Sequence, residues 1–239
     1  MSQQLYLELM KKCLMNTIYE GNHIRRLEGR DWPKKAHTMI GLKRLNNIQY
    51  CLETILSEQI PGDLVEVGVW RGGASIFMKA ILEAYHIDAR LLWVADSFKG
   101  FSFFHHKKRW FTRQILYPFV PGVKVPLKKV QNNFKQYGLL DDRVKFLEGW
   151  AQETLPTAPF GDLALIRIDC DSFEATLAAL NSLYRLLSAG GFVIVDDYGC
   201  FQECREAVEE FRQKNGIVEE IIPIDWTGIY WRKTNSSNR

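Results

Sequence analysis

The chain has 239 residues, of which 46% are hydrophobic and 25% charged, and its net charge is +3 at pH 7. These values are typical of a globular domain with a sizeable core, the charge is too small to indicate a nucleic-acid partner, and no apolar run is long enough to span a bilayer. Five cysteines without a CxxC pair indicate reduced thiols in a cytoplasmic protein rather than a disulfide framework or zinc site.

Residues 1–60 are predicted to form a helical extension. Residues 1–21 mix charged and apolar side chains, as an amphipathic helix does, and residues 29–35 form a polar loop. The segment 41–56 places apolar residues at helical spacing, namely Leu42, Leu45, Ile48, Leu52 and Ile55.

From residue 61 onward the pattern predicts an α/β fold. Short apolar runs predict strands at 64–69, 91–95, 144–147, 163–168 and 192–195. Amphipathic segments predict helices at 73–85, 127–137, 173–187 and 202–214. Such alternation, with mostly unbroken apolar strands, indicates a parallel sheet covered by helices on both faces.

The carboxyl-terminal segment departs from this alternation. Residues 219–224 and 228–232 are predicted to be strands, and only three residues join them. Because so short a connection cannot hold a crossover helix, these two strands should be antiparallel. The α/β domain so defined runs over 61–233, and 234–239 is a polar tail.

A long aromatic and basic connection covers residues 100–126, directly after the second strand of the domain. Long connections at such positions often serve function, so we interpret it as a lid over a substrate site.

Residues suited to a ligand follow three strands. Gly68 allows a tight turn between strand and helix, but Trp70 stands where a GxGxxG motif has its second glycine, which disfavours a pyrophosphate ligand. Asp96 could accept hydrogen bonds from a ribose, and Trp150, after Gly149, could stack on adenine. Each feature alone is also compatible with a simple turn, a helix cap or a core position.

Four aspartates, Asp169, Asp171, Asp196 and Asp197, follow two further strands. At one edge of a parallel sheet, their charges would repel unless a cation neutralised them. Mg²⁺ is the simplest such cation, because it takes a few carboxylates and keeps positions for water and substrate oxygens. The alternative, that one or two of them cap helices, explains all four less well.

These segments resemble the macrocin O-methyltransferase family, which consists of class I methyltransferases that methylate sugar hydroxyls of natural products. The resemblance runs from about His37 to Lys233 and is carried by the sequences HTMIGLKRLNNIQYCLE, DLVEVGVWRGGAS, WVADSFKGF, YGLLDDRVKFLEGW, IRIDCDSFEAT, SAGGFVIVDDYGCFQECREAVEEFR and GIYWRK. It implies a Rossmann-like, mostly parallel seven-stranded sheet with an antiparallel last strand, S-adenosylmethionine and Mg²⁺ as cofactors, and a homo-oligomer.

The resemblance also implies roles for individual residues. Thr38 and Met39 would close over the methionine end of the cofactor, so that 1–60 also acts as a cap. The metal ligands would be Asp169, Asp196 and Asp197. The full cofactor-binding set is predicted to be Thr38, Met39, Glu66, Gly68, Ser75, Asp96, Ser97, Gly149, Trp150 and Asp169.

Methyl transfer from a sulfonium needs an oxygen nucleophile held in line, and a metal lowers the pKa of a hydroxyl and positions it. We predict Asp169 or Asp171 as the proton acceptor, because Ser172 stands where related catechol-type enzymes have a lysine. His105 and His106 on the lid are alternatives.

The sequence departs from the family at His37, where members often have glutamate, and in the lid. Three other functions remain open: a metal-independent methyltransferase, a non-catalytic protein that binds S-adenosylmethionine, and an RNA methyltransferase suggested by the basic lid.

Overall fold

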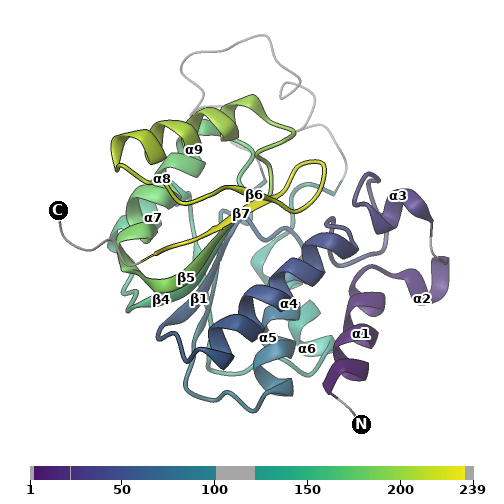
Figure 1. Ribbon diagram of the computed structural model, residues 1–239. Coiled ribbons are helices and arrows are strands. Elements are labelled where there is room, and N and C mark those ends of the chain that lie inside the picture. The colour runs from purple at the N-terminus through teal and green to yellow at the C-terminus, as the bar shows by residue number, and fades with distance from the viewer. Residues whose placement is uncertain (1–2, 22, 101–121, 235–239) are drawn as a thin grey trace.

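A sheet of seven strands forms the centre of the computed structural model, which describes residues 3–21, 23–100 and 122–234 (Figure 1). The strands are β1 (Asp63–Val67), β2 (Leu92–Asp96), β3 (Val144–Glu148), β4 (Leu163–Ile168), β5 (Leu187–Val195), β6 (Ile222–Pro223) and β7 (Ile229–Arg232). Their order is β3-β2-β1-β4-β5-β7-β6. Strands β1 to β5 run parallel, whereas β7 is antiparallel to both β5 and β6. The predicted seven-stranded sheet with an antiparallel end is therefore confirmed.

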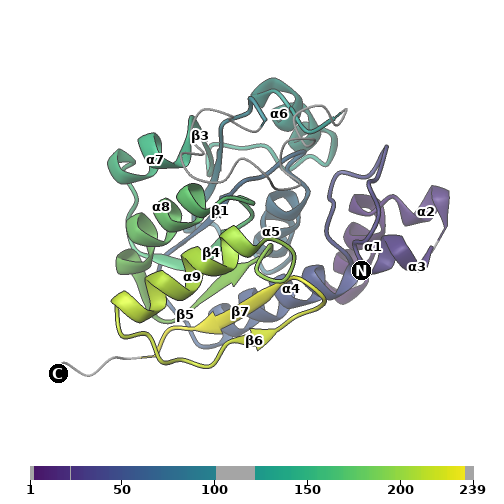
Figure 2. The ribbon, with the colours of Figure 1, turned by 90° about the horizontal axis from the view of Figure 1, so that it is seen from above.

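Helices cover both faces of this sheet, as Figure 2 shows from above. They are α1 (Gln3–Leu14), α2 (Thr17–Glu20), α3 (Ile24–Leu27), α4 (Leu42–Ser57), α5 (Gly73–Ala84), α6 (Leu127–Gln136), α7 (Ala151–Thr154), α8 (Phe173–Leu183) and α9 (Gln202–Lys214). None of the helices in the described ranges is long and apolar enough to cross a membrane.

The apolar runs form strands because their side chains are buried alternately in two cores. Leu64 of β1 belongs to the core that includes α1, α4, α5 and α6, and its neighbour Val65 belongs to the core that includes α8 and α9. All six residues of β4 are buried, and one of them, Arg167, is charged. A buried cation needs nearby carboxylates, and these lie near the carboxyl ends of the parallel strands.

The predicted boundaries differ from the observed ones at several elements, β5 and β6 among them. β5 begins at Leu187 rather than near Phe192, because Gly190 with φ +84° lets the strand continue where a helix was predicted to end. β6 has only two residues, Ile222 and Pro223, of the predicted 219–224. The predicted lid lies largely outside the described residues, which resume at Gly122.

Candidate functional site

The carboxyl ends of the parallel strands are held in register beyond the strands themselves. The amides of Gly68, Gly149, Asp169 and Asp196 each donate to a carbonyl of the neighbouring strand at 2.8–3.0 Å. Open α/β sheets bind ligands at this edge. The residues that follow four different strands are therefore fixed beside one another.

A cavity of about 940 Å³ opens at this edge. This volume lies near the upper end of the range for small-molecule sites, so it has room for a cofactor together with an acceptor. Seven residues of the predicted cofactor set line it: Met39, Gly68, Asp96, Ser97, Gly149, Trp150 and Asp169.

The first turn of the site requires glycine. Gly68 has φ +83°, and a Cβ atom placed on it would lie 1.9 Å from the carbonyl oxygen of Asp169. Any other residue would push β1 and β4 apart at the point where the cavity begins. The sequence-based assignment of a tight turn at this glycine is consistent with this geometry.

Asp96 organises the turn that follows β1. Its Oδ2 accepts hydrogen bonds from the amides of Val69 at 2.8 Å and Trp70 at 3.3 Å, and its Oδ1 accepts from Phe98 at 2.7 Å. Burial raises the pKa of the Asp96 carboxyl, and these three amides oppose the increase. Asp96 thus serves as a turn cap, and since Oδ1 accepts only one of the three amide hydrogen bonds, this oxygen can also accept from a ligand hydroxyl.

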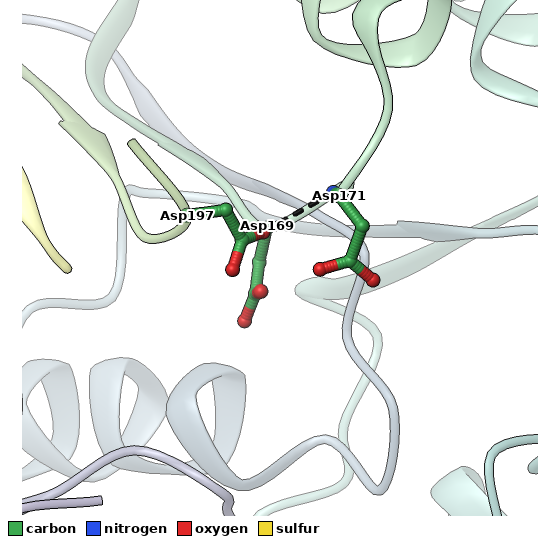
Figure 3. A group of neighbouring side chains, drawn as sticks. All are labelled: Asp169, Asp171 and Asp197. Atoms are coloured by element: carbon green, nitrogen blue, oxygen red, sulfur yellow. Dashed lines mark hydrogen bonds between the residues drawn. The ribbon is translucent and has the colours of Figure 1, made fainter. Parts of the chain in front are cut away.

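Three carboxylates, which we call the acidic cluster, converge at the other end of the cavity: Asp169, Asp171 and Asp197 (Figure 3). One oxygen of each lies within 4.8 Å of the others. The Asp171 amide donates to Oδ2 of Asp197 at 3.2 Å, and Asp171 itself adopts φ 58°, a conformation unusual for a residue with a side chain.

The acidic cluster has strongly perturbed protonation. Burial, followed by the charge of Asp169, raises the pKa of Asp171 to about 7. Burial and the neighbouring carboxylates also raise the pKa values of Asp169 and Asp197 well above their usual range. Oxygen ligands that repel one another in this way suit a hard divalent cation, so the residues present fit the Mg²⁺ predicted from the sequence.

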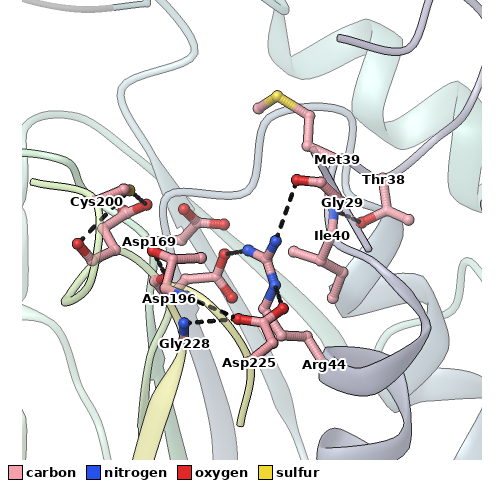
Figure 4. Close-up of polar contacts among 12 residues, drawn as sticks. Gly29, Thr38, Met39, Ile40, Arg44, Asp169, Asp196, Cys200, Asp225 and Gly228 are labelled. Carbon is pink, nitrogen blue, oxygen red and sulfur yellow. Dashed lines mark hydrogen bonds and ion pairs between the residues drawn. The ribbon is translucent and has the colours of Figure 1, made fainter. Parts of the chain in front are cut away.

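Asp196 has a different environment, although it precedes Asp197 directly. Its Oδ1 lies 2.5 Å from Nη2 of Arg167, and its Oδ2 pairs with Nη1 of Arg44 from α4 (Figure 4). Burial acts to raise the pKa of Asp196, but the two guanidinium groups outweigh it and hold that pKa below its usual value. The structure thus brings together two of the three predicted metal ligands, Asp169 and Asp197, while Asp196 is engaged by arginines.

Two functional cations were not anticipated from the sequence. Arg167, with a side chain 1% exposed, pairs with Glu66 and Asp196 and lies 3.0 Å from Oδ2 of Asp169. Arg44 joins Asp196 to Asp225, whose Oδ2 is 2.9 Å from its Nε. A lone arginine inside the apolar run LALIRI was the available signal, because a buried cation needs carboxylate partners.

Comparisons with known proteins agree with this geometry. A model of the macrocin-O-methyltransferase (TylF) family matches residues 22–233. The chain belongs to this family.

Individual relatives of this family member are similar over nearly their whole length. The chain is 51% identical to an 8-demethyl-8-(2,3-dimethoxy-alpha-L-rhamnosyl)-tetracenomycin-C 4'-O-methyltransferase of Streptomyces olivaceus, covering 100% of this chain and 96% of that one. It is 47% identical to a mycinamicin III 3''-O-methyltransferase of Micromonospora griseorubida, covering 97% of each. The structure of the O-methyltransferase NovP superposes with a TM-score of 0.92 at 46% identity, covering 98% and 100% of the two chains. The protein is therefore an O-methyltransferase.

Three predicted cofactor residues of this O-methyltransferase lie behind the cavity wall. Glu66 and Ser75 are 1% and 0% exposed, and the Ser75 hydroxyl donates to the Glu66 carboxylate. Thr38 is 4% exposed, and its Oγ1 accepts from the amide of Ile40 at 3.3 Å. Their direct contact with a cofactor stays a prediction, as do the metal ligands and the proton acceptor. His105 and His106 lie outside the described residues.

Proposed function

We propose that this enzyme transfers a methyl group from S-adenosylmethionine to a sugar hydroxyl of a glycosylated natural product, with Mg²⁺ at the acidic cluster. The acidic cluster carries the proposal. Asp171 and Asp197 have no arginine or lysine within ion-pair distance in the part of the chain that the structure describes, although Arg44 and Arg167 lie close by and neutralise Asp196. Carboxylates left without a cation beside a cavity are suited to bind one.

The two ends of the cavity support different parts of the reaction. Gly68, Asp96 and Trp150 lie at the ends of β1, β2 and β3, where a nucleoside can meet a tight turn, a hydrogen-bond acceptor and an indole. The acidic cluster lies at the ends of β4 and β5. A methyl donor at the first end and an acceptor hydroxyl at the second would meet within the same cavity.

The chain's own carboxylates would orient the acceptor and take its proton. When bound, the sulfonium supplies the methyl group and Mg²⁺ makes the acceptor hydroxyl more acidic. Asp171, which lines the cavity beside Asp169 and Asp197, is placed to receive the hydroxyl proton, and Asp169 is the alternative acceptor. A glycoside is the proposed acceptor class because the relative from Streptomyces olivaceus is named for methyl transfer to a rhamnosyl-tetracenomycin.

Labelled methyl transfer tests this proposal. The protein is incubated with deuterated-methyl S-adenosylmethionine, Mg²⁺ and a panel of rhamnosylated polyketides and macrolides, and mass spectrometry detects a labelled methyl group on the sugar. EDTA should abolish the transfer, and added Mg²⁺ should restore it. Full activity in EDTA would instead identify a metal-independent methyltransferase.

A matched pair of variants localises the metal requirement. Asp197→Asn should lower kcat at least about 100-fold, as loss of a group that stabilises the transition state does, while S-adenosylhomocysteine still binds. Asp142→Asn removes the same charge from an exposed position away from the cavity and should leave kcat unchanged. Equal activity of the two variants would remove the acidic cluster from the mechanism.

A further inference from the structure

The turn between β6 and β7 carries a tryptophan to the cavity. Trp226 is 40% exposed and lines the same cavity as the acidic cluster. An indole is a large apolar surface, and tryptophan is enriched where proteins bind partners or ligands. Its partial exposure at the edge of a deep cavity therefore needs a reason.

The turn is fixed to the acidic edge of the sheet rather than hanging over it. The Thr227 hydroxyl donates to the Asp196 carbonyl at 2.9 Å, and the Gly199 amide donates to the Thr227 carbonyl at 2.8 Å. Oδ1 of Asp225 accepts from the amides of Thr227 and Gly228 at 3.0 Å and 2.9 Å. Figure 4 shows Arg44 beside this turn, where its guanidinium pairs with both Asp225 and Asp196.

The indole itself is also held in place. Its Nε1–H donates to the Glu28 carbonyl at 3.0 Å, and the Arg30 guanidinium lies 4.7 Å from its ring centroid. The guanidinium over one face orients the ring, and the hydrogen bond to Glu28 satisfies its polar edge. A ring fixed by its edge and by its supporting turn loses little entropy when a ligand packs against it.

We infer that Trp226 is a specificity-determining residue that packs against the sugar ring bearing the reacting hydroxyl. This inference rests on the proposed function. The apolar C–H face of a pyranose can cover the exposed part of the indole. Thr227, the next residue, is bonded to the backbone of Asp196, which directly precedes Asp197 of the acidic cluster, and all of them line one cavity, so a ring held there lies near the cluster. The sugar hydroxyls then project toward the carboxylates.

Trp32 is the natural comparison within the same cavity. It is 39% exposed, so its accessibility matches that of Trp226, but its ring contacts Trp70, with 6.4 Å between centroids. The Trp70 amide bonds Asp96, which places Trp32 toward the proposed cofactor end. The sugar should therefore depend on Trp226 more than on Trp32.

Binding without turnover tests the assignment. The full-length protein, saturated with S-adenosylhomocysteine and Mg²⁺, is titrated with methyl α-L-rhamnopyranoside, and saturation-transfer NMR gives the Kd. Trp226→Ala should raise this Kd about tenfold, which corresponds to loss of one stacking contact. Trp226→Phe, which keeps an aromatic face, should raise it less. Tyr19→Ala, at a residue 88% exposed and outside the cavity lining, should not change it.

Unchanged affinity for S-adenosylhomocysteine shows that the Trp226→Ala variant is folded. If that variant does not fold, the Kd of Trp226→Phe for the rhamnoside tests the inference instead. The inference is overturned if the wild type shows no saturable binding of the rhamnoside, if Trp226→Ala and the wild type bind it equally, or if Trp32→Ala weakens it more. Labelled methyl transfer is read separately. Binding that depends on Trp226 without any methyl transfer would refute the proposed function and leave this sugar contact standing.

Discussion

Two neighbouring parts of the same sheet edge neutralise their aspartates in different ways. Asp196 is 2% exposed and pairs with two arginines that the fold supplies. Asp197, the next residue, belongs to the acidic cluster and has no such cation among the residues that the structure describes. Both aspartates follow the end of β5 directly, where the bending chain gives the two side chains different surroundings.

This contrast separates aspartates that are paired within the fold from the carboxylates that we propose to bind the metal. Arg167 and Arg44 come from β4 and α4, and both pair with Asp196 at the end of β5. The pKa of Asp196 is consequently lowered, whereas burial and mutual repulsion raise the pKa values of Asp169, Asp171 and Asp197. One side of the edge is already neutral, and the other would gain stability from a cation.

The largest effect is expected when Arg167, which neutralises Asp196, is replaced. Arg167→Met leaves Glu66 and Asp196 buried without this shared cation, so the free energy of unfolding should fall by about 3–5 kcal/mol. Urea denaturation followed by circular dichroism measures this change. Lys35→Met, which removes an exposed pair with Glu20, is the control and should cost less than about 1 kcal/mol. Similar losses in both variants would show that Arg167 does not hold this edge together.

The next largest effect is expected on Mg²⁺ affinity, when single aspartates of the acidic cluster are compared with Asp196. Calorimetric titration of Mg²⁺ into protein saturated with S-adenosylhomocysteine should show affinity reduced at least about tenfold in Asp171→Asn and Asp197→Asn, because each loses a clustered carboxylate. Asp196→Asn should reduce Mg²⁺ affinity less, since its oxygens are held by Arg44 and Arg167. A greater loss in Asp196→Asn than in Asp171→Asn would support the ligand set predicted from the sequence.

The same contrast shows what the sequence could predict. The apolar runs and the short connection near residue 226 were sufficient to predict the strands and the antiparallel end of the sheet, because strand burial and turn length are local properties. The positions of Gly68, Asp96 and Asp169 at one edge followed from the parallel sheet. These predictions needed only the rule that the carboxyl ends of parallel strands lie at the same edge of the sheet.

The partners of each aspartate could not be predicted in this way. Arg44 is separated from Asp196 by 152 positions, and only the packing of α4 against the sheet brings them together. Asp171 could be recognised as a candidate base, but its nearness to Asp197 depends on a backbone turn with positive φ. Glu66 was predicted from the sequence to bind the cofactor, but its carboxylate pairs with Arg167 inside the core. Contacts distant in sequence decide which acidic group is free to bind.

The smallest expected effect is a pH dependence of stability to which the acidic cluster contributes. The folded pKa of Asp171 is raised to about 7, so folding binds a proton between its ordinary pKa and that value. Metal-free protein should therefore lose stability as the pH rises from 5 to 8. Asp196, whose pKa is lowered, acts only at lower pH, where stability falls as the pH decreases.

Thermal unfolding in EDTA should show Tm falling by several degrees over this interval, since 1 kcal/mol moves Tm by roughly 2–4 °C in a domain of this size. Asp171→Asn should flatten the slope, and Asp142→Asn should not. Mg²⁺ binds the deprotonated carboxylates, so it should raise Tm more at pH 8 than at pH 5. A stabilisation by Mg²⁺ that is equal at both pH values would mean that the ion binds away from the acidic cluster.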